Sequence, residues 1–294
     1  MKSSQIEILG NDDHKIIYGD AIQALESIED ESVNLIFIDP PYNIGKDFCG
    51  IKDKWRTDED YLNWCYEWLN LCLRKLKKDG ALYVMTSTQF MPYFDIYLRD
   101  KIHILSRIVW SYDSSGVQAR KYYGSMYEPI LFCVKDKSNY TFNADDIRVE
   151  AKTGAQRKLI DYRKNPPQPY NTSKIPGNVW DFARVRYRMD EYENHPTQKP
   201  IALLERIIKA SSKEGDTVLD PFSGSFTTSY VAKTLGRKTI GIDLQEEYIK
   251  IGLRRLGLAT EYKGEMLVKP LKETKIKHGK KQDISDNQLN FSDI

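Results

Sequence analysis

The sequence predicts an α/β fold built on a mostly parallel sheet of seven strands, with helices on both faces. Three observations predict it. Short apolar runs recur along the chain, many end in an acidic or turn residue, and four are followed by stretches with helical periodicity. The seven runs are Ile16–Tyr18, Leu35–Ile38, Leu82–Met85, Ile104–Trp110, Ile130–Val134, Thr217–Leu219 and Thr239–Ile242.

Four stretches have the periodicity of amphipathic helices. The clearest runs from Tyr61 to Leu76, where apolar residues recur at i, i+3, i+4 and i+7, and Gly80 is expected to end it soon after. A second helix is expected to start at Pro200, since proline suits the first helical turn. The other two are expected over about Thr227–Leu235 and Gln245–Leu256.

Two parts of the chain depart from the alternation of strand and helix. Ile104–Trp110 and Ile130–Val134 have no clear helix between them, so an antiparallel pair at one edge of the sheet is expected. Residues 136–194 have no long periodic run and contain the proline-rich segment Asn165–Pro169. Because this stretch is also rich in aromatic residues, it is typical of a functional insertion rather than of plain disorder.

These features divide the chain into four parts. Residues 1–135 and 195–262 are expected to form one α/β domain, and residues 136–194 interrupt it. Residues 263–294 are rich in charged and amide side chains and are expected to be a loosely ordered tail. No apolar run approaches the roughly 20 residues of a membrane helix, and the N-terminus lacks a signal-peptide core. The chain is therefore expected to be cytoplasmic.

Positive charge is concentrated in the irregular segment. The whole chain carries +2, but Ala151–Asp190 holds nine Lys and Arg against three Asp, so the rest carries −4. A basic segment interleaved with aromatic rings suits phosphate neutralisation and base stacking, although a solvated charged face would give the same charge pattern. The expected DNA contacts are Arg157, Lys158, Arg163, Lys164, Arg184, Arg186 and Arg188.

The motif Asp39-Pro40-Pro41-Tyr42 directly follows the apolar run Leu35–Ile38. Methylating an exocyclic amine of a base needs acceptors for its two protons, because its lone pair is otherwise delocalised into the ring. Asp39 fits one acceptor, and the Pro40 carbonyl, held rigid by consecutive prolines, fits the other. Tyr42 fits a stacking role, and ligands bind at this end of the strands in open α/β sheets. A strand followed by an acidic proline turn is the plain alternative.

A second turn, Asp220–Thr228, lies between a predicted strand and a predicted helix. Its small residues and glycine let the backbone approach a nucleotide-like ligand closely. Asp243 stands nineteen residues after Gly224, a spacing typical of acids that bind ribose hydroxyls. Because the GxGxxG fingerprint is absent, a dinucleotide dehydrogenase is the weaker interpretation. S-adenosylmethionine (SAM) has a ribose but no pyrophosphate, and suits this turn.

Together these motifs resemble the β class of amino-DNA methyltransferases, in which a DPPY motif precedes the SAM-binding FxGxG motif and the target-recognition region lies between them. Asp39–Tyr42 comes first here and Phe222–Ser225 last, with His195–Pro200 (HPTQKP) similar to the start of the family's motif X helix. The matches span roughly residues 15–257. The resemblance implies a Rossmann-like SAM-dependent methyltransferase sheet with a target-recognition insertion.

The function that this resemblance implies is transfer of a methyl group from SAM to the N6 amine of a flipped adenine in duplex DNA. Aspartate at the first position of the DPPY motif favours adenine over cytosine N4, which is kept as the alternative. A DNA-binding protein that has lost catalysis is the more distant one. Double-stranded DNA and SAM are the expected partners, and a homodimer and a cognate restriction endonuclease are left open.

The resemblance also assigns roles to individual residues. Asp39, Pro40, Pro41 and Tyr42 would be catalytic. Asp20 would contact the SAM adenine, Phe222 would lie against the adenine or sugar, and Thr197 and Lys199 would lie near the methionine carboxylate or the turn that holds it. The full set expected to contact cofactor is Asp20, Asp39, Thr197, Lys199, Asp220, Phe222, Ser223, Gly224, Ser225 and Asp243.

Three further expectations concern single positions. The family usually has glycine where this chain has Phe226, and the bulky ring is expected to narrow the space beside the methionine end of SAM. His195 is expected to be structural, and no metal site is expected because the four histidines lack paired ligand spacing. Asp113-Ser114-Ser115-Gly116 is expected to form a loop near the flipped base, or a plain surface turn.

Overall fold

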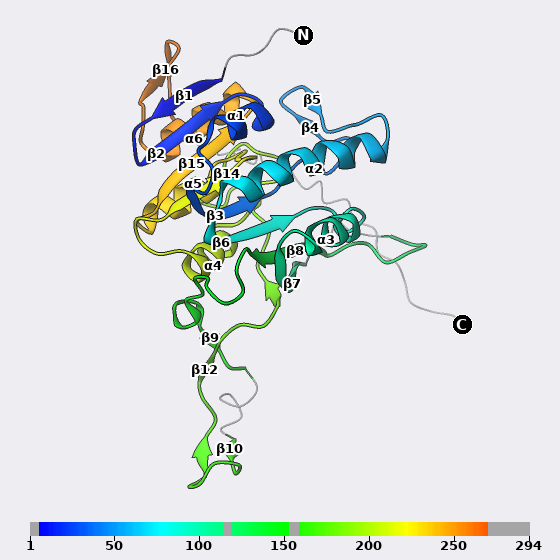
Figure 1. The fold of residues 1–294 in the computed structure, drawn as a ribbon, viewed down its shortest axis with the longest axis vertical. Helices are drawn as coiled ribbons and strands as arrows, with labels where there is room; N and C mark the ends of the chain where they lie inside the picture. Colours follow the sequence, from blue (N-terminus) through cyan, green and yellow to red (C-terminus); the bar gives the residue numbers. More distant parts are fainter. Residues whose placement is uncertain (1–5, 114–118, 153–158, 270–294) are drawn as a thin grey trace, which may run out of the picture.

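A nine-stranded β-sheet forms the centre of the molecule (Figure 1). The structure is a computed structural model that describes residues 6–113, 119–152 and 159–269. All seven predicted strands lie in this sheet, so the predicted α/β fold is confirmed. In their order across the sheet the strands are β1 (Glu7–Gly10), β2 (His14–Tyr18), β15 (Lys238–Asp243), β14 (Thr217–Asp220), β3 (Val33–Ile38), β6 (Leu76–Met85), β8 (Tyr127–Val134), β7 (His103–Ser111) and β13 (Val179–Asp181).

Most neighbouring strands run parallel. β2, β15, β14, β3 and β6 are parallel neighbours, whereas β1 is antiparallel to β2, and β8 is antiparallel to both β6 and β7. The predicted antiparallel pair is therefore confirmed, but its place at the edge is wrong. The edge strand is β13, which pairs parallel with β7. Its three residues are too few to show a strand period in the sequence.

Alternate residues of β3 face two different helical layers. Ile36 and Ile38 pack with α1, α2 and α3, while Leu35 and Phe37 pack with α4 and α5. Helix α6 packs over β2 with Ile16. Burial on both faces explains why β3 reads as a continuous apolar run. The helices are α1 (Ala21–Ser27), α2 (Asp58–Lys75), α3 (Met91–Arg99), α4 (Ile201–Ser211), α5 (Thr227–Thr234) and α6 (Glu246–Arg255).

All four predicted helices are present, with one difference. Helix α2 ends at Lys75 because Leu76 takes an extended conformation, and the chain enters β6 at once. Gly80 therefore lies inside a strand and does not end the helix. Helices α1 and α3 were not predicted: the seven residues of α1 are too few to show a helical period, whereas α3, with nine, is longer than the predicted α5. Asp20 fixes the start of α1 by accepting hydrogen bonds from the backbone N–H groups of its first turn.

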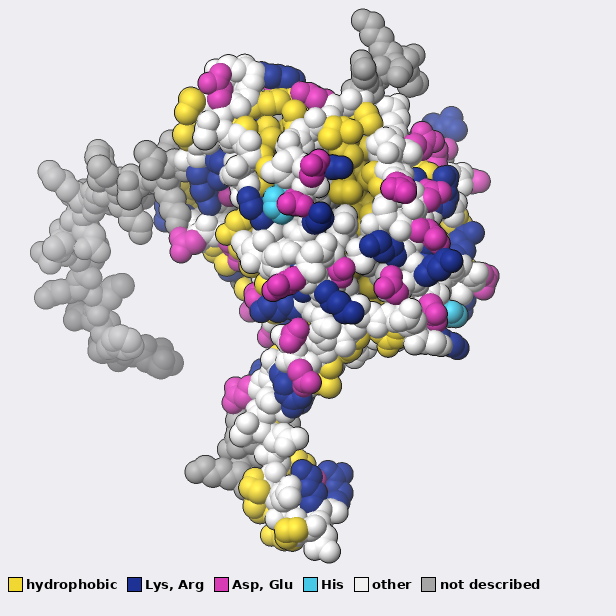
Figure 2. All heavy atoms as spheres, turned by 60° about the vertical axis from the view of Figure 1, so that its left-hand side comes forward, with side chains coloured by type: hydrophobic (Ala, Val, Ile, Leu, Met, Phe, Trp, Pro, Cys, Tyr) yellow, Lys and Arg dark blue, Asp and Glu magenta, His cyan; other side chains and the backbone are white. Residues whose placement is uncertain are grey.

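Part of the irregular insertion projects from the body of the molecule as an arm, whose described residues are 148–152 and 159–174 (Figure 1). Two short antiparallel ladders build it. β9 (Val149–Glu150) pairs with β12 (Ser173–Lys174) near the body, and β10 (Ile160–Asp161) pairs with β11 (Gln168–Pro169) toward the tip. Basic and apolar side chains lie together at this tip (Figure 2). A 3₁₀ helix, η1 (Ala144–Ile147), precedes the arm and packs against α4.

Two hairpins complete the described chain. β4 (Asp47–Phe48) and β5 (Ile51–Lys52) follow the DPPY motif, and β16 (Glu261–Tyr262) pairs with β17 (Glu265–Met266). The second hairpin crosses the expected start of the tail at residue 263, and residues 270–294 lie outside the described part. Within the described ranges no helix is both long and apolar enough to cross a membrane.

Candidate active site

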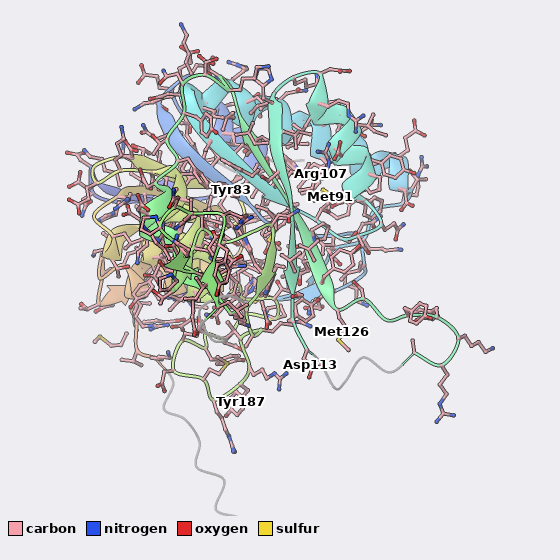
Figure 3. All side chains as sticks on the ribbon, turned by 90° about the horizontal axis from the view of Figure 1, so that it is seen from below. Tyr83, Met91, Arg107, Asp113, Met126 and Tyr187 are labelled. Atoms are coloured by element: carbon pink, nitrogen blue, oxygen red, sulfur yellow. The ribbon has the colours of Figure 1, made fainter. Side chains whose placement is uncertain are left out.

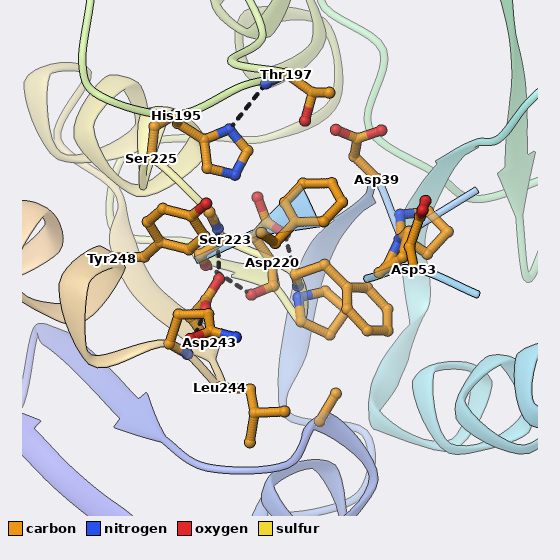
Figure 4. A pocket seen from close by; sticks show the side chains of 18 of the residues that line it. Asp39, Asp53, His195, Thr197, Asp220, Ser223, Ser225, Asp243, Leu244 and Tyr248 are labelled. Atoms are coloured by element: carbon orange, nitrogen blue, oxygen red, sulfur yellow. Dashed lines mark hydrogen bonds between the residues drawn. The ribbon is translucent and has the colours of Figure 1, made fainter. Parts of the chain in front are cut away.

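Three aspartates stand at the carboxyl ends of neighbouring strands of the sheet. Asp39 comes directly after β3, and Asp220 and Asp243 are the last residues of β14 and β15. Since β3, β14 and β15 are consecutive parallel neighbours, their carboxyl ends meet. All three acids line one pocket of about 340 Å³. Figure 4 shows Asp39 and Asp243 on different sides of this pocket with Asp220 between them.

The Asp39 carboxylate is held by two side chains. The Tyr42 hydroxyl donates to Oδ1 at 2.6 Å, and the Lys199 ammonium lies 2.5 Å from Oδ2. Lys199 comes from the HPTQKP segment, and its ammonium also lies 5.7 Å from the centre of the Tyr42 ring. Lys199, which was expected near the methionine carboxylate or the turn that holds it, lines the pocket and pairs with the Asp39 carboxylate.

A second carboxylate, that of Glu128 in β8, completes this cluster. Its Oε2 accepts a hydrogen bond from the Tyr42 hydroxyl at 3.1 Å and lies 3.7 Å from the Lys199 ammonium. Burial raises the pKa of Asp39, Lys199 opposes that shift, and Glu128 adds to it. Burial lowers the pKa of Lys199, but the charges of Asp39 and Glu128 outweigh it and leave the pKa raised. Lys199 is therefore a cation between two carboxyl groups.

The backbone of the DPPY turn is fixed by residues that follow it. The Asp53 carboxylate accepts a hydrogen bond from the Tyr42 N–H at 3.0 Å and another from the Lys46 N–H. The Tyr61 hydroxyl donates to the Pro41 carbonyl at 2.8 Å. Because the Pro41 carbonyl already accepts a hydrogen bond from Tyr61, the Pro40 carbonyl is the better candidate to accept a hydrogen bond from a bound ligand.

Backbone amides hold the other two acids. Asp220 accepts from the Phe222 N–H at 3.0 Å and from the Thr228 hydroxyl at 2.6 Å. Asp243 accepts from the N–H groups of Gly224 and Gln245, both at 2.8 Å. Burial raises the pKa of each acid to about 7, although these hydrogen bonds oppose the shift.

Position 224 needs glycine for two reasons. Its φ is +49°, and a Cβ there would lie 2.6 Å from the His195 Nε2. Ser223 and Ser225 flank it, and both line the pocket. The turn between β14 and α5 therefore brings backbone close to whatever fills the pocket, as its sequence predicts.

Aromatic rings form one wall of the pocket. Phe222 lies edge-on against Trp64 and Trp68 of α2, with ring centroids 5.6 and 5.2 Å apart. Trp64 and Trp55 line the pocket with Phe222, and so does Asp20 at the start of α1. The predicted cofactor residues Asp20, Asp39, Thr197, Lys199, Asp220, Phe222, Ser223, Gly224, Ser225 and Asp243 are thus all brought to one pocket.

Phe226 does not narrow the pocket. Its side chain is fully buried in the cluster around α6, and it is absent from the pocket lining. A Cβ at Gly241 of β15 or at Gly252 of α6 would lie 2.7 Å from its ring. The ring fills the space that these two glycines leave, so the expectation of a constricted methionine site is wrong.

His195 lines this pocket and also a second, neighbouring cavity. Its Nδ1 accepts a hydrogen bond from the Thr197 N–H at 3.3 Å, and its ring packs edge-on against Tyr248 at 4.6 Å (Figure 4). Burial, with the nearby charges of Lys199 and Lys46, lowers the pKa of His195 to about 3. The ring is therefore neutral near pH 7. Among the described residues no group of three or more side chains could hold a metal ion.

A second cavity of about 400 Å³ adjoins the first. Tyr42, His195, Thr197 and Lys199 line both. The second cavity adds side chains from β7, β8 and the segment after β13, and these are Trp110, Tyr112, Tyr127, Glu128 and Arg184. The DPPY motif therefore stands at the junction of two cavities.

The predicted DNA-binding residues fall into two groups. Arg184 lines the second cavity with its guanidinium 4.9 Å from the Tyr112 ring centre, and Arg186 donates to the Asp113 carbonyl at 3.2 Å. Asp113, Met126 and Tyr187 lie at this end of the β7–β8 pair (Figure 3), and exposed Arg188 lies beside Tyr187.

The second group lies at the tip of the arm. Arg163 and Lys164 are exposed there, and Arg163 pairs with Asp161 at 2.8 Å. Arg157, Lys158 and the residues 114–116 of the predicted loop lie outside the described part. The described basic residues therefore lie in two separate regions. One is the mouth of the second cavity, with Arg184 and Arg186, and the other is the tip of the arm, with Arg163 and Lys164.

Several site residues were missed from the sequence. Asp53 and Trp55 lie in an irregular segment, and Glu128 and Tyr127 begin a strand that is recognisable only by its apolar end. Nothing in their spacing links them to the DPPY motif. Only the fold brings Glu128 to Tyr42, across 86 positions of sequence.

Comparison with known proteins now adds a decisive finding. A family described as DNA methylase, N6_N4_Mtase, matches residues 33–254. The chain belongs to this DNA methylase family, and it is therefore an enzyme. Its match covers both turns and the insertion between them.

Curated relatives agree. The DNA adenine methyltransferase YhdJ of Escherichia coli (strain K12) is 64% identical over 260 residues, which cover 88% of each chain. The type II methyltransferase M.HpaI of Haemophilus parainfluenzae is 40% identical over 246 residues, covering 83% of this chain and 74% of the relative.

Solved structures share the fold. The PvuII DNA methyltransferase (cytosine-N4-specific) superposes with a TM-score of 0.64 at 18% identity, covering 84% of this chain and 87% of that one. The M1.HpyAVI–SAM complex gives a TM-score of 0.57 at 24% identity, covering 83% and 98%. At these identities the likeness concerns the fold alone.

Proposed function

We propose that this enzyme transfers a methyl group from SAM to the N6 amine of an adenine flipped out of duplex DNA. The observation that carries the proposal is that Tyr42 lines both cavities and is hydrogen-bonded to Asp39, which lines the first. One cavity has the acids and aromatic wall suited to SAM, and the other has the tyrosines suited to a base. The name of the 64% identical relative supports adenine, so cytosine N4 is not favoured.

The first cavity fits SAM in its chemistry. Asp243 and Asp20 offer carboxylates for hydroxyl and amine groups, and the rings of Phe222 and Trp64 offer an apolar wall for a purine. The absence of a side chain at Gly224 leaves room that a Cβ would take. When bound there, SAM supplies the electrophilic methyl group. His195 Nδ1 accepts from the Thr197 N–H, which leaves Nε2–H as a donor toward the pocket.

The second cavity fits a flipped base. A stacked base cannot reach the methyl group, so it must leave the duplex. The Asp39 carboxylate and the Pro40 carbonyl would then accept hydrogen bonds from the two amine N–H groups, and the Tyr42 ring would stack on the base. These two acceptors would aim the amine nitrogen at the methyl group that bound SAM would supply, and the Asp39 carboxylate would be the nearest group to take the proton that the methylated amine loses. Orientation and charge stabilisation matter more here than a strong base.

The order of motifs supports membership of the permuted β class. Asp39–Tyr42 comes first, the insertion follows, and His195–Pro200 leads to Phe222–Ser225. On this proposal residues 1–135 and 195–262 form the catalytic domain, residues 136–194 recognise the target, and residues 263–294 are an appended tail. Arg184 and Arg186 at the cavity mouth would contact phosphates or bases, and Arg163 and Lys164 would reach DNA from the arm.

A direct assay tests this function. The purified protein is incubated with tritiated SAM and duplex DNA from a host that lacks adenine methylation, and the labelled base is identified after hydrolysis. N6-methyladenine is the expected product, and Asp39→Ala should make none. Label in cytosine, in RNA alone or in no nucleic acid would overturn the proposal.

The family resemblance leaves open a homodimer and a cognate restriction endonuclease. Light scattering with and without DNA tests the first. The second is tested by cutting the methylated DNA with endonucleases of known recognition sequence, once that sequence has been mapped. Loss of cutting by one endonuclease would identify a matched specificity.

A further inference from the structure

Glu128 is the one carboxylate of the Asp39 cluster that no sequence motif contains. It is the second residue of β8, whereas Asp39 follows β3 and Lys199 precedes α4. Its side chain is 15% exposed, so it is mostly removed from water. It lines the second cavity and is absent from the lining of the first. Glu128 therefore faces the proposed base and not the proposed cofactor.

Both oxygens of Asp39 already have a partner. Oδ1 accepts from the Tyr42 hydroxyl at 2.6 Å, and Oδ2 pairs with Lys199 at 2.5 Å. Each oxygen has a second lone pair, but Asp39 lines the first cavity and not the second, so it must turn to accept a hydrogen bond from an amine in the second cavity, and that turn weakens its contact with at least one of these two donors. The donor that gives way needs another acceptor, because an unpaired buried hydroxyl or ammonium is costly.

Glu128 is within reach of both donors at once. Its Oε2 is 3.1 Å from the Tyr42 hydroxyl and 3.7 Å from the Lys199 ammonium. The hydroxyl is thus already shared between two carboxylates, and the ammonium needs only a small movement to reach the second. The contacts around Asp39 therefore include a second carboxylate that can accept from the same two donors.

We propose that Glu128 is a positioning residue for methyl transfer: it takes the Tyr42 hydroxyl and the Lys199 ammonium when Asp39 turns to the amine of the target base. This inference rests on the function proposed above. Glu128 keeps the Tyr42 ring oriented and the Lys199 charge paired while Asp39 is engaged with the substrate.

The charge of Glu128 also gives the proposal an independent readout. Tyr42, Lys199 and Glu128 face Asp39, with Asp220 nearby, while Lys46 and Arg184 face Lys199 from other segments. Glu128 contributes to the raised pKa of Asp39, after burial. Asp39 must be ionised to accept the amine protons. Removing the charge of Glu128 should therefore shift the acidic limb of the kcat profile to lower pH.

The experiment compares Glu128→Gln and Glu128→Ala with the matched surface control Glu205→Gln, whose ion pair with Lys209 lies on α4. Glu128→Ala should lower kcat roughly 10- to 100-fold, the size expected for an interaction with charged partners. Its Kd for SAM, measured by calorimetry, should stay within about twofold, because Glu128 does not line the SAM cavity. Glu205→Gln should match the wild type throughout.

Glu128→Gln separates positioning from folding, because the amide keeps the size and one acceptor oxygen. It should retain more activity than the alanine variant and show the shifted acidic limb. In a Tyr42→Phe background the loss from Glu128→Ala should be smaller, since the shared hydroxyl is gone. This non-additivity is not expected of a residue that only supports the fold.

Wild-type kcat and an unmoved acidic limb in Glu128→Gln, together with wild-type kcat in Glu128→Ala, would overturn the inference. An equal loss of SAM affinity and kcat would overturn it as well. The proposed function fails separately: in that case the wild-type protein itself transfers no methyl group to adenine. If wild type is active and Asp39→Ala is not, only the role of Glu128 is in question.

Discussion

The three aspartates at the strand ends of the site are held in two different ways. Asp220 accepts hydrogen bonds from the Phe222 N–H and the Thr228 hydroxyl, which follow it in the chain, and Asp243 accepts from the Gln245 N–H beside it and from the Gly224 N–H of the turn after β14. Asp39 is held instead by Tyr42 and Lys199, two side chains that have a second carboxylate in reach. The first arrangement fixes a loop, while the second can exchange partners. Position after a strand therefore does not determine what an acid does.

The largest expected effect comes from replacing Asp39, the aspartate that is held by side chains. Asp39→Ala removes an acceptor that the transition state needs, and should lower kcat by at least about 10²- to 10³-fold. The turn itself is held by Asp53 and Tyr61, so the fold should persist. Single-turnover methylation measures the loss, with calorimetry of SAM binding as the control. Turnover near the wild-type rate would refute the mechanism.

The next effect concerns the fixed turn. Phe226 ends that turn in a left-handed conformation, φ +55°, and fills the space beside Gly241 and Gly252. Glycine there would relieve about 1 kcal/mol of backbone strain but lose about 3–5 kcal/mol of packing. Phe226→Gly should therefore lower the free energy of unfolding by about 2–4 kcal/mol. Urea denaturation measures it, and unchanged stability would place the ring outside the core.

Asp243 tests whether a residue that holds a loop also binds cofactor. Asp243→Ala removes the proposed ribose acceptor and leaves the Gly224 N–H without its partner, so SAM binding should weaken by about 1.5–3 kcal/mol. Calorimetry gives the value. Unaltered affinity in a folded variant would restrict Asp243 to a structural role.

Asp243 also makes stability depend on pH. Burial raises its pKa to about 7, whereas an aspartate in the unfolded chain titrates near 4. Between these values the folded protein retains a proton that the unfolded chain has lost. The free energy of unfolding should therefore fall as pH rises from about 4 to 7, and Asp243→Asn should remove that part of the slope. An identical pH dependence in the variant would contradict the raised pKa.

The sequence predicted seven of the nine strands of the central sheet, four of the six α-helices in the described ranges and the two turns, because each depends on local patterns. It misjudged residues whose surroundings come from distant segments. Phe226 was compared with a family glycine, but the matching glycines 241 and 252 belong to other elements. Lys199 lines the pocket to which it was assigned, but its ion pair with Asp39 joins positions 160 apart, and nothing local in the sequence predicts that partner. Local motifs indicate which chemistry is present, whereas tertiary packing decides which partner each side chain meets.

The smallest expected effect compares the two basic regions. Arg184 and Arg186 lie at the mouth of the second cavity, while Arg163 and Lys164 lie at the tip of the arm. If a cavity-mouth arginine neutralises a DNA phosphate, its replacement by alanine should reduce the slope of log K against log salt by about one. Arg184→Ala/Arg186→Ala and Arg163→Ala/Lys164→Ala should each weaken DNA binding while leaving SAM binding intact. Fluorescence anisotropy over a salt series separates them: a flattened slope in the first pair alone would confine the DNA interface to the cavity mouth, and unchanged slopes in both would place it elsewhere.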